Sequence, residues 1–455
     1  MRTAAVDMTN GPLAKGIIKF SLPLILSNVL QVLFHMADLA VVGKFCGSFA
    51  LGSVGSTAIL VALFTGVLIG LGGAVNALTA QAVGARDEKR LSGYVHTSFV
   101  ICALVGLFIL IFGALFSRGV LELLGTKDEL IDGAELYMRI YFMGMPALAV
   151  YNWGSAVFSA AGNTKKPMVF LIVSGVLNVA LNLVFVLVCR MTVDGVAFAS
   201  IISQYLSAFL VVFALIREKG NHRMSLGKLT PASLAGCGAE AKKILTLGLP
   251  AAAQNAIFYI ANLFVQAGVN TFDAVMVSGN SAATNADTLV YDVMAAFYTA
   301  CGSFVGQNYG AGNKKRVRDS LLISMAYAFI AAFVMGVLLV VFGRGFLLMF
   351  ASEEAVIDAG MKRLSIMGLS YCVSAFMDAP IAASRALGKS VMPTAAVICG
   401  SCIFRILWVK TVFAYFGTIP SLYLLYVCSW ILTAVFELGY FVFVYRRLYK
   451  THGQM

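Results

Sequence analysis

The sequence predicts an all-α integral membrane protein with twelve transmembrane helices, in two six-helix bundles related by a parallel internal repeat. Three observations lead to this prediction: the composition, the length of the apolar blocks, and a pattern shared by the two halves. Of the 455 residues, 60% are hydrophobic and only 12% are charged, and the mean hydropathy is +0.89. A soluble chain of this length needs more charge to cover its surface.

The apolar residues form blocks of about 20 residues, the length that a helix needs to cross the hydrocarbon core of a bilayer. Val169 to Cys189 contains no charged side chain, and neither does Leu321 to Phe342. Inside hydrocarbon the backbone must satisfy its own hydrogen bonds, so such blocks indicate helices, whereas a β-barrel has short alternating segments. The predicted spans are 17–42, 54–82, 94–116, 134–158, 168–189, 195–216, 243–269, 281–308, 320–342, 360–384, 392–414 and 421–445.

Positive charges are distributed unevenly between the two sides of these spans. The net charge of +12 is compatible with nucleic-acid binding, but more than two thirds of the 33 Lys and Arg residues fall on the side of both termini. The positive-inside rule makes that side cytoplasmic. Topology therefore explains the charge, and we expect no nucleic-acid partner. Lys15 and Lys19 precede a full-length span rather than a short cleavable signal.

The two halves of the chain share a repeated pattern. Gln81 to Arg90 (QAVGARDEKR) closes the second span and Gln307 to Arg316 (QNYGAGNKKR) the eighth, so that several residues recur 226 positions apart. In the same register lie Ile131-Asp132 and Ile357-Asp358, Gly162 and Gly388, and Pro167 and Pro393, while Leu22-Pro23 and Leu249-Pro250 differ by 227.

Six spans in each half place both halves in the membrane with the same orientation, so the predicted repeat is parallel. We expect an N-terminal lobe over 1–216, a polar cytoplasmic linker over 217–242 and a C-terminal lobe over 243–455. Two such bundles around a central cavity suit alternating access better than a static pore.

Motifs of enzymes and metal sites are missing from the sequence. Cys399 and Cys402 form a CxxC on an apolar helix without a second pair or a nearby His, so we interpret them as small buried residues. No Gly-rich phosphate loop with Lys-Ser/Thr is present, and the histidines are isolated. We expect no enzyme, no cofactor and no bound metal. The four histidines are His35, His96, His222 and His452.

Asp38 in the first span is the leading candidate for an ion or proton site, because a charge in the bilayer usually faces a cavity or a partner. Asn178 and Asn182 in the fifth span are four residues apart and share a helix face. Ser200 in the sixth span adds a hydroxyl. A carboxylate with amide and hydroxyl oxygens suits a proton or a hard cation. The alternatives are that Asp38 reaches the outer water and that the amides only join helices.

Four further acids lie in the second half, and we expect some of them to contact a cationic substrate or a second ion. Asp287 and Asp292 are five residues apart and point to different faces of the eighth span, and Asp378 lies inside the tenth. Arg405 in the eleventh span is the expected counter-charge for one of these acids, with a purely structural ion pair as the alternative. Glu437 is expected to reach the interface near the end of the last span.

Over residues 10–448 the chain resembles the MATE family, the multidrug and toxic compound extrusion transporters. The resemblance lies in Met36 to Gly43 (MADLAVVG), Gly279 to Asp287 (GNSAATNAD), Phe304 to Asn313 (FVGQNYGAGN), Gly195 to Ser200 (GVAFAS) and Arg385 to Gly388 (RALG). It implies a twelve-helix exporter that exchanges amphipathic, often cationic compounds for Na⁺ or H⁺. The 33 Phe, 17 Tyr and 19 Met residues could line a permissive pocket.

The resemblance also assigns roles to residues. The first-helix carboxylate of the family falls on Asp38, its fifth-helix Asn on Asn178 and its sixth-helix hydroxyl on Ser200. Asn182 stands where many members have an acid, which removes a charge from the site. The eighth- and tenth-helix acids fall on Asp287 and Asp378, so candidate acids lie in both lobes.

Two other functions remain open. The first is a flippase or exporter of a lipid-linked precursor or other metabolite, although flippases of this wider superfamily usually have fourteen spans and a basic cavity. The second is an integral membrane enzyme, for which the sequence offers no motif. The expected partners are the lipid bilayer and small amphipathic molecules, and we expect the chain to act as a monomer.

Overall fold

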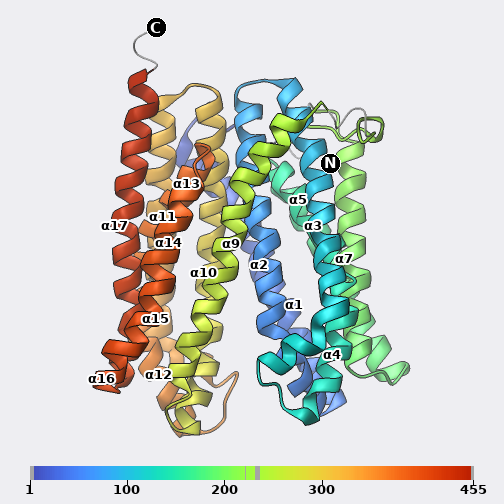
Figure 1. The fold of residues 1–455 in the computed structure, drawn as a ribbon, viewed down its shortest axis with the longest axis vertical. Coiled ribbons are helices and arrows are strands. Elements are labelled where there is room, and N and C mark those ends of the chain that lie inside the picture. Colours follow the sequence, from blue (N-terminus) through green and yellow to red (C-terminus); the bar gives the residue numbers. More distant parts are fainter. Residues whose placement is uncertain (1–4, 221, 231–235, 452–455) are drawn as a thin grey trace. The chain divides into compact units, whose positions relative to one another are not determined.

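The computed structural model describes residues 5–220, 222–230 and 236–451, and within these ranges the chain is helical, with no strand. Figure 1 shows the helices with their labels. In the first half they are α1 (Leu13–Val41), η1 (Val42–Cys46), α2 (Ser48–Gly84), α3 (Glu88–Leu123), α4 (Asp128–Phe142), α5 (Met145–Ala160), α6 (Lys165–Leu183), η2 (Val184–Val188), α7 (Val193–Ile216) and η3 (Leu226–Lys228). In the second half they are α9 (Gly238–Val269), α10 (Ala274–Gly310), α11 (Lys314–Leu347), α12 (Glu354–Met367), η4 (Tyr371–Ser374), α13 (Ala375–Ala386), α14 (Val391–Val397), η5 (Ile398–Ile403), α15 (Phe404–Trp408), η6 (Val409–Phe413), α16 (Ala414–Phe416) and α17 (Ile419–Thr451).

Ten helices of the described chain are long and apolar enough to cross a membrane, which confirms the predicted fold class. The count is eleven if α12 and the segment Tyr371–Ala386, which are bent by 43° at a short break, form one span. The remaining predicted span, 134–158, falls on α4 and α5, which have 15 and 16 residues. Pro146 stands at the start of α5, where its missing N–H is harmless.

The bounds of the helices repeat with the same spacing as the residues. α2 and α10 have 37 residues each, and both their first and their last residues are 226 positions apart. The starts of α3 and α11, the starts of α4 and α12, and the ends of α5 and α13 differ by the same number. The break between α4 and α5 therefore recurs between α12 and α13. The internal repeat extends to the irregular parts of the chain.

Glycines let neighbouring helices pack closely against both breaks. A Cβ on Gly106 of α3 would lie 2.7 Å from the Cα atom of Pro146. A Cβ on Gly336 of α11 would lie 1.9 Å from the carbonyl oxygen of Gly368, which follows α12. In each half, the third long helix thus crosses the broken helix at backbone contact, as small residues permit in membrane proteins.

Contacts between Cα atoms divide the chain into two compact units. One contains Leu26–Ala252 with the first residues up to Val6, and the other contains Asp7–Ile25 with the chain from Ala253 onward. The boundaries lie inside α1 and α9, just after Pro23 and Pro250. The predicted lobe limits at 216 and 243 stay a prediction.

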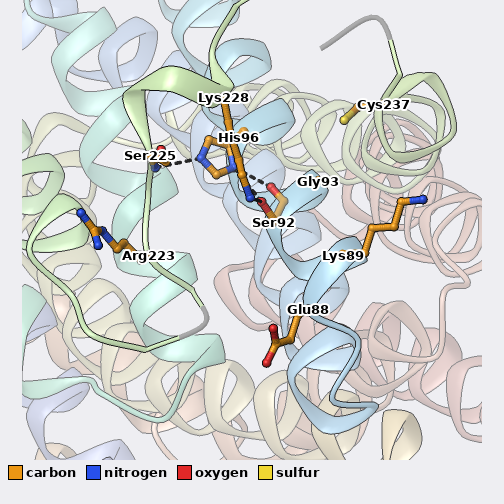
Figure 2. Close-up of a pocket in the computed structure, with 9 residues that line it drawn as sticks. All are labelled: Glu88, Lys89, Ser92, Gly93, His96, Arg223, Ser225, Lys228 and Cys237. Carbon is orange, nitrogen blue, oxygen red and sulfur yellow. Dashed lines mark hydrogen bonds between the residues drawn. The ribbon is translucent and has the colours of Figure 1, made fainter. Parts of the chain in front are cut away.

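In the first unit, the segment after α7 is attached to the start of α3 through His96, which is 3% exposed. Its Nε2 accepts a hydrogen bond from the backbone N–H of Ser225 at 2.9 Å, and its Nδ1 lies 2.7 Å from the carbonyl oxygen of Ser92 (Figure 2). These partners fit the neutral ring with the proton on Nδ1. Lys228 donates to the hydroxyl of Ser92 at 2.9 Å. Both contacts hold this part of the predicted linker on α3.

Candidate ion and substrate sites

The first unit brings together the four side chains proposed for the ion site. Asn182 on α6 donates one amide N–H to the Asp38 carboxylate on α1, and its Nδ2 lies 3.4 Å from Oδ1 of Asn178. Asn178 in turn donates to Ser200 on α7, with 3.5 Å between Nδ2 and Oγ. The four residues form one chain of hydrogen bonds across three helices.

The Asp38 carboxylate lies among neutral side chains and is not paired with a cationic side chain in the described part of the chain. Asp38 is half-buried, while Asn178, Asn182 and Ser200 are buried, and none of the salt bridges in the described chain involves Asp38. Tyr137 and Tyr141 on α4 stack with 5.6 Å between ring centroids, and both are close enough to interact electrostatically with Asp38. The carboxylate is therefore free to gain a proton or a small cation.

Asn182 is suited to serve Asp38 in two protonation states. In the arrangement described, its N–H donates to the ionised carboxylate, and its buried Oδ1 has no hydrogen-bond partner. A rotation of the amide would present Oδ1 to a protonated Asp38, which could then donate. A neutral amide can fill both roles, whereas a carboxyl group at 182 could donate to ionised Asp38 only when protonated itself.

The helices that carry this site become irregular beside it. α1 continues into the π-helical turn η1 four residues after Asp38, and α6 continues into η2 two residues after Asn182. Single π-helical turns inside helices often occur at functional sites. The two turns share no sequence pattern, since η1 contains Gly43 and Lys44 whereas η2 is wholly apolar.

In the second unit, Asp287 on α10 is fully engaged. Arg363 on α12 forms an ion pair with one carboxylate oxygen, and Tyr371 donates its hydroxyl to the other. Arg363 also donates to Oδ1 of Asn280 at 2.6 Å, which accepts from the Tyr423 hydroxyl at 2.9 Å. The counter-charge of Asp287 is therefore Arg363 and not Arg405. The sequence does not reveal this pair, because Arg363 follows Lys362 directly and both resemble charges at the end of a span.

Arg405 on α15 has a different environment, although it is also fully buried. Its Nε donates to Ser429 at 3.2 Å and its Nη1 to Asn262 at 3.1 Å. The guanidinium carbon lies 4.7 Å from the ring centroid of Phe258 and 4.6 Å from that of Tyr426. Its role as a structural counter-charge stays a prediction, since its charge acts on Asp378 without forming a salt bridge in the described chain.

The other second-half acids take part in further electrostatic interactions. Asp292 is half-buried and interacts with Tyr259 and Tyr291. Asp378 on α13 has a buried Oδ2 without a partner, and the charges of Arg385 and Arg405 act on it. Their predicted roles in binding substrate or a second ion stay predictions.

Glu437 does not reach the interface, contrary to expectation. It is 0% exposed, and neither carboxylate oxygen has a hydrogen-bond partner. The reason is that its side chain faces the interior of the second unit, where the charges of Arg385 and Asp378 act on it.

These features define a polytopic helical membrane protein with an internal repeat and buried ionisable sites in both units. The description "MatE" belongs to the family model that matches residues 23–184 and 250–409. The chain belongs to the MatE family, and its members are transporters rather than enzymes.

Curated relatives and solved structures agree with this assignment. The chain is 30% identical over 369 residues to "Probable multidrug resistance protein YpnP" of Bacillus subtilis, with 81% of each chain covered. It is 21% identical over 355 residues to a "FAD transporter" of Shewanella oneidensis, with 77% of each covered. A solved "multidrug resistance MATE family transporter of the MOP superfamily" has the same fold, with a TM-score of 0.89 at 19% identity, covering 99% of this chain and 100% of that one.

Proposed function

We propose that this protein is a secondary active multidrug efflux transporter that exchanges amphipathic, often cationic compounds for Na⁺ or H⁺ by alternating access. The observation that carries the proposal is Asp38, a half-buried carboxylate in a family of transporters, hydrogen-bonded to Asn182 and without a salt bridge in the described chain. Relatives named as multidrug resistance proteins support the substrate class.

Coupling through Asp38 requires two states that bind the ion differently. A ligand shifts a conformational equilibrium only by its difference in affinity between the two states. A protonated or cation-bound Asp38 has no net charge to solvate, so α1 and α6 can close around it, whereas the free carboxylate favours a wetter arrangement. Drug and ion that bind to alternate states then exchange across the membrane.

The proposed location is the cell membrane of a bacterium, with both termini and the linker in the cytoplasm and the chain active as a monomer. The charge bias of the loops supports this orientation, and the curated relatives named above are bacterial. Asn182 carries no charge, so Asp38 is the only carboxylate of its hydrogen-bonded cluster. Both H⁺ and Na⁺ therefore stay candidates for the coupling ion.

Labelling of Cys237 in the predicted linker tests the orientation. Cys237 is half-buried and is not in a disulfide. In a variant that keeps only this cysteine, a membrane-impermeant maleimide should react with inside-out vesicles and leave intact cells unlabelled. A variant that keeps only Cys189, which is exposed near the opposite end of α6, should show the reverse. Labelling of Cys237 in intact cells would contradict the proposed topology.

Dye export from cells tests the function. Cells that express the chain should accumulate several-fold less ethidium than cells with an empty vector, and a protonophore or removal of Na⁺ should abolish the difference. The condition that abolishes it identifies the coupling ion. Equal accumulation in both strains would contradict multidrug export.

A second candidate is export of an endogenous metabolite that carries acidic groups. Two observations favour it: the relative named as a FAD transporter and the buried arginines of the second unit. Export of such a compound with no effect on ethidium would favour this candidate.

A further inference from the structure

The second unit contains a buried positive charge that no ion pair neutralises. Arg405 is 0% exposed, and a guanidinium stays protonated in proteins. In the described residues, no carboxylate oxygen lies within the 4.0 Å that defines a salt bridge to it. Its contacts are the neutral oxygens of Ser429 and Asn262 and two aromatic faces. The charge of Asp378 acts on Arg405 only from beyond salt-bridge distance, and a buried charge without a close partner is costly.

Arg363, in the same unit, differs from Arg405 because it has an ion pair. It is 2% exposed and forms an ion pair with Asp287. Both arginines make cation–π contacts with the ring of Tyr426. The guanidinium carbon lies 5.6 Å from the ring centroid in Arg363 and 4.6 Å from it in Arg405. Two guanidinium groups thus share one aromatic ring, while only one of them has a carboxylate. Of these two arginines, Arg405 is the one without an ion pair in the described residues.

One nitrogen of Arg405 is available for a ligand. Nε and Nη1 are occupied by Ser429 and Asn262, but the buried Nη2 has no hydrogen-bond partner. The hydroxyl and the amide hold the planar group in a fixed orientation. The π-helical turns η5 and η6 flank α15 on both sides, which again places irregular helix beside a polar site.

The internal repeat relates this site to that of Asp38. In the register of Pro167 and Pro393, Arg405 corresponds to Val179, the neighbour of Asn178. In the register of Pro23 and Pro250, Asn262 corresponds to His35, one turn before Asp38. The contact between α15 and α9 in the second unit therefore corresponds to the contact between α6 and α1 in the first. The first carries an unpaired carboxylate and the second an unpaired guanidinium.

We propose that Arg405, oriented by Asn262 and Ser429, is the anchor of a subsite for a carboxylate or phosphate group of the exported molecule. This inference rests on the proposed function and deepens it, since the preferred substrates are then amphiphiles with an acidic group, zwitterions included. Nη2 donates to the anionic oxygen, while the rings of Phe258 and Tyr426 hold the guanidinium in place. Arg405 is enclosed in the arrangement described, so entry requires one of the helices around it to move.

A matched pair of dyes tests the subsite. Rhodamine B carries a carboxylate, and its ethyl ester is the same cation without it. Purified wild-type protein should bind rhodamine B more tightly than the ester in fluorescence polarisation. In Arg405→Gln, affinity for rhodamine B should fall about tenfold or more, as expected for loss of a charge-assisted hydrogen bond, while the ester changes less than about twofold. Arg405→Lys, which keeps the charge, should retain an intermediate preference.

The controls separate the subsite from folding and from the proposed function. Arg446→Gln, at an exposed arginine of α17, should leave both affinities unchanged. If Arg405→Gln does not fold, the preference of the wild type for the acid over the ester still tests the proposal. Equal wild-type affinities, or equal losses for both dyes in Arg405→Gln, would overturn it. Failure of ethidium export would refute the proposed cation exchange. The binding of rhodamine B and its ester would still test the subsite at Arg405 by itself.

Discussion

Replacement of Asp38 by Asn should abolish gradient-driven export of ethidium while the protein remains folded. Asn keeps the size of the side chain and can still hydrogen-bond to Asn182, but it can neither release a proton nor neutralise a cation. Export in proteoliposomes should fall to the level of empty vesicles, a loss of about 100-fold or more if Asp38 is the coupling group, as general acid–base groups are worth about 10² to 10⁴.

The control for this variant is Asp132→Asn on α4. The Asp132 side chain is 83% exposed and pairs with Arg118, and surface pairs of this kind contribute little to stability. Its export should match the wild type. Melting temperatures in detergent and elution volumes should be the same for both variants. Normal export by Asp38→Asn would move the coupling site to the acids of the second unit.

Removal of either partner of the Asp287–Arg363 pair should destabilise the second unit, and removal of Asp287 should cost more. Breaking a buried ion pair by deleting one partner costs roughly 3–5 kcal/mol. Asp287→Asn leaves a guanidinium whose side chain is 3% exposed, whereas Arg363→Gln leaves a carboxylate that is 26% exposed and can take up a proton. The asymmetry follows because arginine cannot discharge itself in this way.

A double-mutant cycle measures this pair directly. The variant with both Asp287→Asn and Arg363→Gln should be more stable than the sum of the two single losses predicts, because neither charge is left alone. Thermal unfolding in detergent provides the comparison. Additive losses, or single variants as stable as the wild type, would show that the pair contributes nothing. Changed substrate range in Asp287→Asn without loss of stability would instead favour the substrate role predicted for this acid.

The sequence predicted the parts of the fold that depend on local pattern. Apolar length placed the spans, and the recurrence of Gln81 to Arg90 as Gln307 to Arg316 gave the spacing that the helix bounds follow. The cluster around Asp38 was also predictable, because Asn178 and Asn182 share a helix face and few other polar side chains lie at that depth. Their hydrogen bonds agree with this expectation.

The second unit could not be predicted as well, for a physical reason. Its polar groups are numerous, so composition does not say which acid meets which arginine. Arg363 takes Asp287 because α10 and α12 pack together, while Arg405 meets Asn262 and Ser429 instead. The burial of Glu437 depended on which side of α17 packs against the other helices, which the apolar residues around it do not show. The π-helical turns share no sequence pattern, since η2 is wholly apolar while η1 and η6 contain Lys44 and Lys410.

The most direct test of the account is ethidium efflux from proteoliposomes that contain only this protein, with Na⁺ and H⁺ gradients imposed one at a time. One of the two imposed ion gradients should drive ethidium against the concentration gradient of ethidium. The same ion gradient should have no effect on vesicles with Asp38→Asn. Ethidium movement that is indifferent to both gradients, or equal in the two proteins, would contradict cation-coupled exchange through Asp38.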